Sequence, residues 1–186
     1  MLLQTVMVRH WKAILAVICS LAPLRAATLE RLSLDDLIQK STAIVRCRVQ
    51  SSYAAFRGNL IYTHYQVQVS EQLKGAASVA SDILVPGGTA NGVRQTYGGV
   101  PQLTEGKEYV LFLWAGKSGT QVIGFTQGVF DLAKDSSGQT MAVQGPITAT
   151  LVDGASGEVM RNTEGIALRL TDLRKRISGS APGATL

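Results

Sequence analysis

The sequence has few of the side chains on which most catalytic and metal sites depend. Its 186 residues include two cysteines and two histidines. Two cysteines are too few for a disulfide-dense scaffold or a four-cysteine zinc site. Only 6% of the residues are aromatic and 17% are charged, whereas 46% are hydrophobic. This balance excludes a disordered polyelectrolyte, and the length favours a single domain.

The first 26 residues have the order of a secretory signal peptide. Basic residues at 9 and 12 precede an apolar run over residues 13–24, which is shorter than the roughly 20 residues that span a bilayer. Ala26 supplies the small residue before the cut, and Ala27 then begins the mature chain. We therefore expect residues 1–26 to be removed and the product to be periplasmic or extracellular. An uncleaved membrane anchor is the alternative.

Removal of this segment changes the charge on which a nucleic-acid partner would depend. The whole chain has a formal charge of +5. Residues 1–26 contain Arg9, Lys12, Arg25 and no acidic residue, so 15 basic and 13 acidic residues remain, a net charge of +2. We expect no nucleic-acid partner, no membrane span in the mature chain and a monomer. Cys47 is the one cysteine left, so no intramolecular disulfide can form.

Alternation of apolar and polar residues predicts a mainly β mature chain. The Gly-containing turn at 57–59 joins two runs into a hairpin. The run 108–114 is almost continuously apolar, which favours a central strand with both faces covered. The predicted strands are 43–53, 60–73, 83–85, 108–114, 120–125, 128–133, 140–143 and 147–152.

Two helices are expected to flank the strands. Ser33 and Asp36 form a capping box at the start of a helix over residues 32–40. Asn162 or Thr163 caps a second, amphipathic helix that ends near Ser178, with an apolar stripe of Ile166, Leu170, Leu173 and Ile177. We predict one domain over residues 27–178 and a disordered tail over 179–186. Its fold is a partly closed antiparallel barrel of OB type, with a two-sheet sandwich as the alternative.

Three isolated residues could carry chemistry. Cys47 is in phase with Val45 and Val49, which indicates a buried, unreactive thiol. His64 lies on the polar side of its strand, and we interpret it as a solvated residue that binds no metal. Glu71 falls in the inward phase of the same strand. A β-bulge that turns it outward is one explanation, and a buried carboxylate with a partner is the other.

The segment 86–106 holds six glycines and two prolines. Long structureless loops inside compact domains are often functional. Arg94, Gln95 and Tyr97 lie among these glycines, and Arg and Tyr often anchor interfaces. We therefore predict an exported, non-catalytic binding module without a cofactor, whose segment 86–106 recognises a protein, peptide or glycan. A hydrolase using Glu71 or His64 and a structural envelope protein are the alternative functions. For the segment itself, the alternatives are a passive connector and an unrecognised glycine-rich hairpin.

Three segments together resemble exported bacterial proteins of unknown function with a core similar to netrin-type domains and tissue inhibitors of metalloproteinases. They are Leu32-Ser33-Leu34-Asp35-Asp36-Leu37 with residues 43–49, then the run 67–75 ending Leu73-Lys74-Gly75, and then residues 110–113. The resemblance covers about residues 30–130 and implies an OB-like barrel. Those inhibitors chelate zinc through an N-terminal cysteine. The mature chain begins at Ala27 without one, so no functional residue carries over.

The signal-peptide assignment predicts the N-terminus of the exported protein. Mass analysis or Edman sequencing of protein recovered outside the cytoplasm should give Ala27 as the first residue, because Ala26 satisfies the small-residue requirement before the cut. Recovery of exported protein that retains Met1 would contradict the assignment.

Overall fold

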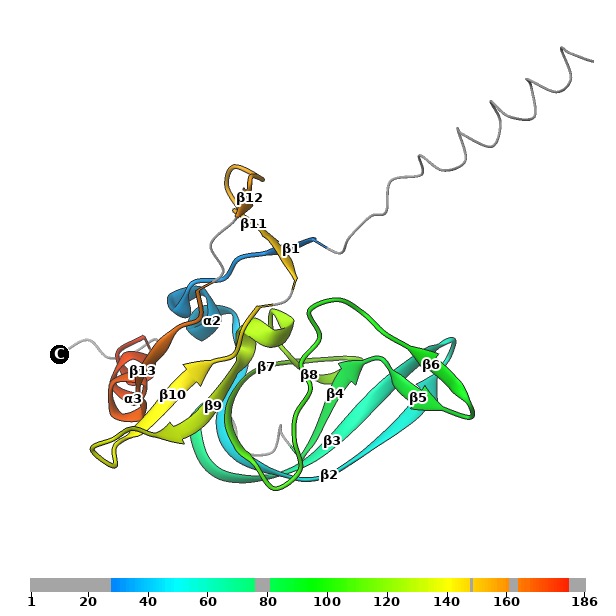
Figure 1. The fold of residues 1–186 in the computed structure, drawn as a ribbon, viewed down its shortest axis with the longest axis horizontal. Coiled ribbons are helices and arrows are strands. Elements are labelled where there is room, and N and C mark those ends of the chain that lie inside the picture. The colour runs from blue at the N-terminus through cyan, green and yellow to red at the C-terminus, as the bar shows by residue number, and fades with distance from the viewer. Residues whose placement is uncertain (1–27, 76–80, 148, 161–163, 181–186) are drawn as a thin grey trace, which may run out of the picture.

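The computed structural model describes residues 28–75, 81–147, 149–160 and 164–180. Within them the chain is mainly β with two α-helices, as predicted (Figure 1). No helix in these ranges has the length and hydropathy needed to cross a membrane. The predicted signal peptide with its cleavage site, the capping residues Asn162 and Thr163, and residues 181–186 of the predicted tail lie outside the described residues.

Five strands pair in a ring. The hairpin of β2 (Ala43–Arg57) and β3 (Leu60–Lys74) continues through β4 (Asp82–Pro86) to β8 (Gly119–Val122). Both β8 and β2 pair with β7 (Glu108–Gly116), which completes the ring. The β4–β8 pair is parallel and the other four pairs are antiparallel. The expected mainly β fold with a partly closed sheet is confirmed, whereas the sheet is not wholly antiparallel as expected, because β4 and β8 run parallel.

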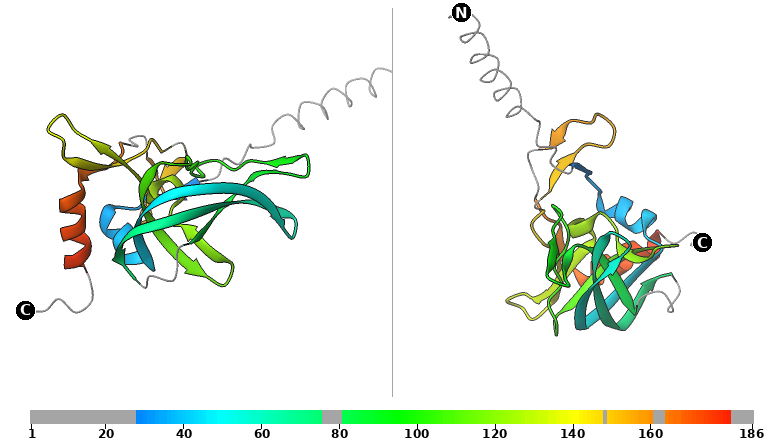
Figure 2. Two further views of the ribbon diagram at one scale, coloured as in Figure 1. Left: turned by 90° about the horizontal axis from the view of Figure 1, so that it is seen from below. Right: turned by 90° about the vertical axis from the view of Figure 1, so that its right-hand side faces the viewer.

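The β2–β3 hairpin is bent because its register shifts at three places. These irregularities lie between Ile44 and Val45, between Arg46 and Cys47, and between Val49 and Ser51. A bulge bends a strand and increases its twist, and Figure 2 shows the hairpin as a strongly curved ribbon. The concave side encloses one core cluster, built from Ala43, Val45, Cys47, Val49, Tyr65, Val67, Ile83, Val85, Leu103, Tyr109, Leu111, Leu113 and Val122.

The other side of β2 and β7 is covered by helices. Three further strands extend the sheet beyond β7: β9 (Val129–Lys134), β10 (Thr140–Gln144) and β13 (Ala167–Arg169). The second core cluster lies between this sheet and the two helices; its fully buried members include Ile44, Val110, Phe112, Phe130 and Leu173. The central strand β7 is therefore buried on both faces from Tyr109 to Leu113, as its continuous apolar run predicted.

The two helices agree with the sequence to different degrees. The helix α2 (Leu34–Lys40) begins at the predicted capping box of Ser33 and Asp36. The helix α3 (Leu170–Gly179) begins later than predicted, because the three residues of β13 pair with β10 before the helix starts. Three residues of the predicted apolar stripe are buried in α3: Leu170, Leu173 and Ile177. The fourth, Ile166, lies before β13 and is not part of the helix.

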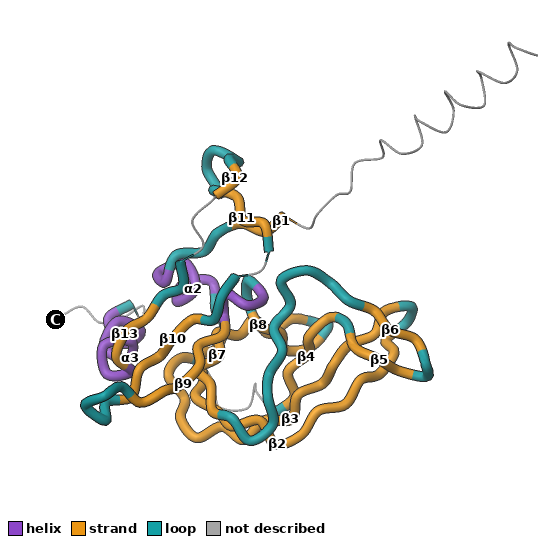
Figure 3. The backbone as a smooth tube through the Cα atoms, in the orientation of Figure 1, coloured by secondary structure: helices purple, strands orange, loops and turns teal. Residues whose placement is uncertain are grey.

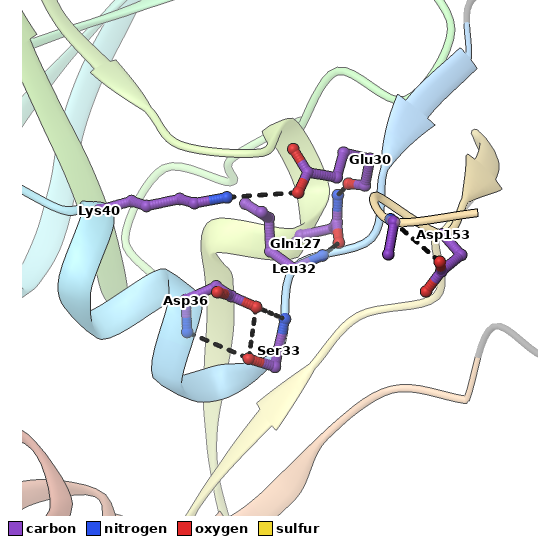
Figure 4. Close-up of polar contacts among 8 residues, drawn as sticks. Glu30, Leu32, Ser33, Asp36, Lys40, Gln127 and Asp153 are labelled. Carbon is purple, nitrogen blue, oxygen red and sulfur yellow. Dashed lines mark hydrogen bonds and ion pairs between the residues drawn. The ribbon is translucent and has the colours of Figure 1, made fainter. Parts of the chain in front are cut away.

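Two buried glutamines join segments that are distant in the sequence. Gln127, in the 3₁₀ helix η2 (Phe125–Gly128), is fully buried; its side chain accepts a hydrogen bond from the Leu32 N–H (2.8 Å) and donates one to the Glu30 C=O (2.9 Å) (Figure 4). Gln144 donates from its amide to the Gln127 C=O and accepts from the Ile166 N–H. These four hydrogen bonds connect the segment 30–32 and Ile166 to η2 and β10. We call Gln127 and Gln144 the glutamine clamp.

A second, small sheet lies beside this clamp. The strand β1 (Thr28–Glu30) pairs in parallel with β11 (Thr150–Val152), which pairs with β12 (Val159–Met160). Figure 3 shows this sheet apart from the ring, above α2. The predicted strand over 147–152 is thus confirmed only in its last three residues.

The clamp predicts a large cost for removing the Gln127 side chain. Gln127→Ala leaves the buried Leu32 N–H and the partly buried Glu30 C=O without the Gln127 side chain as partner, and the free energy of unfolding should fall by about 2–4 kcal/mol. Urea unfolding measures this. Gln139→Ala, at an exposed turn position, is the control and should change the value by less than about 0.5 kcal/mol. Equal effects of both substitutions would contradict the clamp.

Candidate functional site

The first part of segment 86–106 is a hairpin, so its prediction as a structureless loop was wrong there. The strands β5 (Gly88–Ala90) and β6 (Val93–Gln95) are antiparallel partners. Asn91 and Gly92 connect them with φ of 50° and 76°. Two successive positive φ angles are what a tight hairpin turn requires, and Asn-Gly is its strongest sequence signal. That dipeptide could have identified the hairpin.

The second part of the segment crosses the open end of the ring (Figure 3) and contributes to its core. Leu103 is buried in the inner cluster, and Val100 packs against it. The hydroxyl of Tyr65 accepts a hydrogen bond from the Leu103 N–H (3.3 Å), and that of Tyr109 accepts one from the Thr104 N–H (2.9 Å). This part of the segment therefore contributes to folding, so it is not available in full for recognition.

Gln95 attaches the two-stranded β5–β6 sheet to the main sheet. Its side-chain oxygen accepts a hydrogen bond from the Ile61 N–H (2.7 Å), and its amide nitrogen donates to the Asn59 C=O (3.0 Å). Both groups belong to the turn end of the β2–β3 hairpin. Of the three predicted ligand-binding residues, Gln95 thus has its polar atoms engaged by the backbone.

Arg94 and Tyr97 remain available at the surface. Arg94 is exposed, and in the described part of the chain its guanidinium has neither an ion pair nor a hydrogen bond. The Tyr97 side chain is 41% exposed. Its ring lies beside Gly87, where a Cβ atom would come within 3.5 Å of it. The residue at this position is favoured as glycine by its φ of 98° and by the Gln95 C=O, to which a Cβ atom would come within 3.0 Å.

A hollow of about 240 Å³ lies between the hairpin and the crossing segment. Arg94 and the hydroxyl-bearing residues Thr63, Thr89 and Thr96 line it together with apolar residues. The apolar lining comes from Val85, Pro86, Val100 and Pro101. The volume suits one side chain or a sugar-sized group rather than a large cofactor, and the lining combines a cation and hydroxyls with apolar walls, as binding pockets commonly do.

His64 is partnered and mostly buried, so its interpretation as a solvated residue was wrong. Its side chain is 13% exposed, and its Nδ1 lies 2.9 Å from an Asp82 carboxylate oxygen. The Tyr53 ring stacks on the imidazole at 4.6 Å with an interplanar angle of 8°. Asp82 also accepts a hydrogen bond from Gln66. No serine, threonine or cysteine side chain is hydrogen-bonded to His64 in the described residues, so no catalytic triad is formed.

Glu71 is turned by a bulge and also has a partner. Val69 pairs with Cys47, and a register shift between Arg46 and Cys47 places Glu71 opposite Arg46. Glu71 therefore does not point into the core as Val69 does. Arg174 of α3 donates to both of its carboxylate oxygens, at 2.7 and 2.5 Å. These hydrogen bonds hold the pKa of Glu71 below its ordinary value of 4.5, against the opposing effect of burial. An ionised, paired carboxylate of this kind is unsuited to act as a general acid at neutral pH.

The Glu71 pair lies next to a second ionic group. Arg46 and Arg48 each donate to Glu108, at 2.6 and 2.7 Å. Hydrogen bonds from Arg46 are the main reason that the pKa of Glu108 lies below its ordinary value. His64 and Glu71 are seven residues apart on β3, which is about 23 Å along a strand, so the two residues proposed for hydrolysis do not form one site.

Cys47 is fully buried, as predicted. Burial raises the pKa of its thiol to about 12, and the negative charge of Glu108 adds to the rise. The thiolate is the reactive form of cysteine. Cys47 is therefore unsuited to nucleophilic catalysis near neutral pH.

The described residues contain no cluster of three or more histidine, cysteine, aspartate or glutamate side chains that could hold a metal ion. No protein-family model matches this chain, and comparison with curated proteins finds no significant relative. The candidate site is therefore defined by geometry alone: the hairpin, the exposed Arg94 and Tyr97, and the hollow that Arg94 helps to line.

The Glu71–Arg174 pair predicts a dependence of stability on pH. Glu71→Gln should lower the free energy of unfolding by about 1 kcal/mol at pH 7, because the pair attaches α3 to β3. Since the folded-state pKa of Glu71 is lowered, the contribution of the pair is complete above pH 4.5 and is lost as the pH falls through the folded-state pKa. Urea unfolding should show a difference from wild type that shrinks at pH 3.

Glu158→Gln is the matched control, since Glu158 is exposed. It should change the free energy of unfolding by less than about 0.5 kcal/mol at either pH. A Glu71→Gln difference as large at pH 3 as at pH 7 would assign the effect to packing rather than charge.

Proposed function

We propose that the protein is an exported, non-catalytic binding module that recognises a protein, peptide or glycan through the hairpin part of segment 86–106. The observation that carries the proposal is the exposed Arg94 guanidinium at a hollow of about 240 Å³. An uncompensated cation beside hydroxyl groups suits a carboxylate or another acidic group of the ligand. Tyr97 adds an exposed ring with few rotatable bonds, a residue type that contributes strongly to binding.

Rigidity of the hairpin supports recognition rather than passive connection. The Gln95 side chain holds β6 to Ile61 and Asn59, and the Gly87 N–H donates to the Ile61 C=O (2.8 Å). These bonds fix Arg94 and Tyr97 before a ligand arrives. A preorganised surface loses less conformational entropy on binding.

The hydrolytic alternative has less support. Glu71 is committed to Arg174, and His64 is committed to Asp82. Neither has a nucleophilic side chain as a hydrogen-bond partner in the described ranges. A binding function uses groups that the fold leaves free, whereas hydrolysis would have to use groups that the fold has paired.

The proposal predicts that the double variant Arg94→Ala/Tyr97→Ala binds the ligand more weakly but unfolds with nearly the same free energy as wild type. Ligands are first captured on immobilised exported protein from an envelope extract and identified by mass spectrometry, and the purified ligand is then titrated. Binding should weaken by roughly 1–3 kcal/mol. The free energy of unfolding should change by less than about 0.5 kcal/mol, because both side chains are exposed.

Lys117→Ala is the control, because Lys117 is an exposed cation at the β7–β8 turn. It should leave the affinity unchanged. An identified ligand that binds the double variant and wild type equally would place recognition elsewhere and overturn the proposal. A loss of stability in the double variant would instead identify Tyr97 as a structural residue.

A further inference from the structure

The distal half of β2 has an open edge. The pairing of β2 with β7 ends at Arg48, and Val49 makes the last backbone bonds on that side, to Gly106 and Lys107. From residue 50 to residue 57, no described strand pairs with this edge, although the other edge pairs with β3 as far as Arg57. In Figure 1 this part of β2 forms the margin of the sheet.

The hydrogen-bond pattern shows which backbone groups face the open edge. Ile61 bonds through its N–H to Gln95 and through its C=O to Gly87, so its backbone faces away from β2. Its register partner is Phe56. In an antiparallel pair, when one residue faces away from the partner strand the residue opposite does so too. Phe56 therefore directs its N–H and C=O to the open edge, as do Ala54 and Ser52 by alternation.

At Ser52 this edge contacts the crossing segment, because the Ser52 hydroxyl donates to a Glu105 carboxylate oxygen (2.8 Å). From Tyr53 to Arg57 it lacks the usual protection against pairing with another chain. Natural edge strands are blunted by lysine, proline, inward-pointing charges or a covering segment. Residues 50–57 read Gln-Ser-Ser-Tyr-Ala-Ala-Phe-Arg, with Arg57 as the single charge and no proline. The exposed fractions of Tyr53 and Phe56 are 52% and 40%. An uncharged, partly aromatic edge of this length is a surface for strand addition.

We propose that this edge pairs with the same edge of a second copy of the chain, antiparallel and about a two-fold axis through Ala54. In that register Ala54 faces Ala54 of the second copy, and Ser52 faces its Phe56. All the outward N–H and C=O groups of Ser52, Ala54 and Phe56 then gain partners, which is the self-complementarity that a two-fold interface requires.

The side chains fit the same register. Tyr53 lies opposite Ala55 of the second copy, and Phe56 lies opposite Ser52, so each large residue meets a small one. One face of the Tyr53 ring is stacked on His64, and the other face is directed toward the open edge, where it can cover Ala55. Arg57 lies opposite Ser51, so no like charges oppose each other. The arrangement replaces the monomer expected from the sequence and does not rest on the proposed function.

Sedimentation equilibrium of the exported protein over a wide concentration range tests the pairing. Wild type should approach the mass of a dimer as concentration rises. Ala54→Pro removes an N–H that faces away from β3, so the β2–β3 hairpin keeps its own bonds. The dissociation constant of the dimer should rise at least about tenfold.

Tyr53→Lys is the second variant and keeps the inference testable if Ala54→Pro does not fold. It adds a positive charge near Arg57 of the second copy and should also raise the dissociation constant at least about tenfold. Tyr97→Lys makes the same change at a ring of similar exposure two residues after β6, and it should leave the mass unchanged. Circular dichroism confirms that each variant is folded.

Three results would overturn the proposal. They are a wild-type monomer at all concentrations, a dimer that survives Tyr53→Lys, and a dimer that Tyr97→Lys weakens as much as Tyr53→Lys does. Loss of ligand binding in Arg94→Ala/Tyr97→Ala with an unchanged dimer would leave this inference intact, so the two proposals fail separately.

Discussion

The arrangement of this fold depends on the irregular register of β2 and β3, above all on the shift between Val49 and Ser51. Before the shift, β2 is held between β3 and β7; beyond it, the strand continues with one partner. The bends at the shifts allow the hairpin to curve into the ring. The shift between Arg46 and Cys47 places Glu71 opposite Arg46. The pairing of β2 with β7 ends where β7 begins at Glu108, so the distal edge of β2 has no strand partner among the described residues.

Much of the fold could be predicted because the deciding interactions are local. The capping box of Ser33 and Asp36 lies within four residues, and the alternation around Cys47 needs only a two-residue period. The start of α3 could not be predicted in the same way. Ile166 fits the helical stripe, but residues 167–169 form a strand because β10 offers them backbone partners. That choice depends on a distant segment, which periodicity does not report.

The residue types of the candidate site were predicted from the sequence, but which of these side chains are free depends on contacts with distant segments. Arg94 and Tyr97 are exposed, as a recognition role requires. The side-chain amide of Gln95 is hydrogen-bonded to the backbone of Ile61 and Asn59, which lie 34 and 36 residues earlier in the sequence. The burial of Leu103 and the pairing of His64 with Asp82 likewise depend on partners from other strands. Asn91-Gly92 was a local signal, and reading it as a hairpin turn would have divided the segment correctly.

The position of β1 has a consequence for the order in which the chain can fold. Thr28–Glu30 pairs with Thr150–Val152, and the Leu32 N–H bonds to Gln127, 95 residues further on. The backbone of this segment therefore gains its native strand partner only after most of the polypeptide has been synthesised. Contacts of such large sequence separation slow folding. We therefore expect the small sheet of β1, β11 and β12 to be among the last parts of the chain to form.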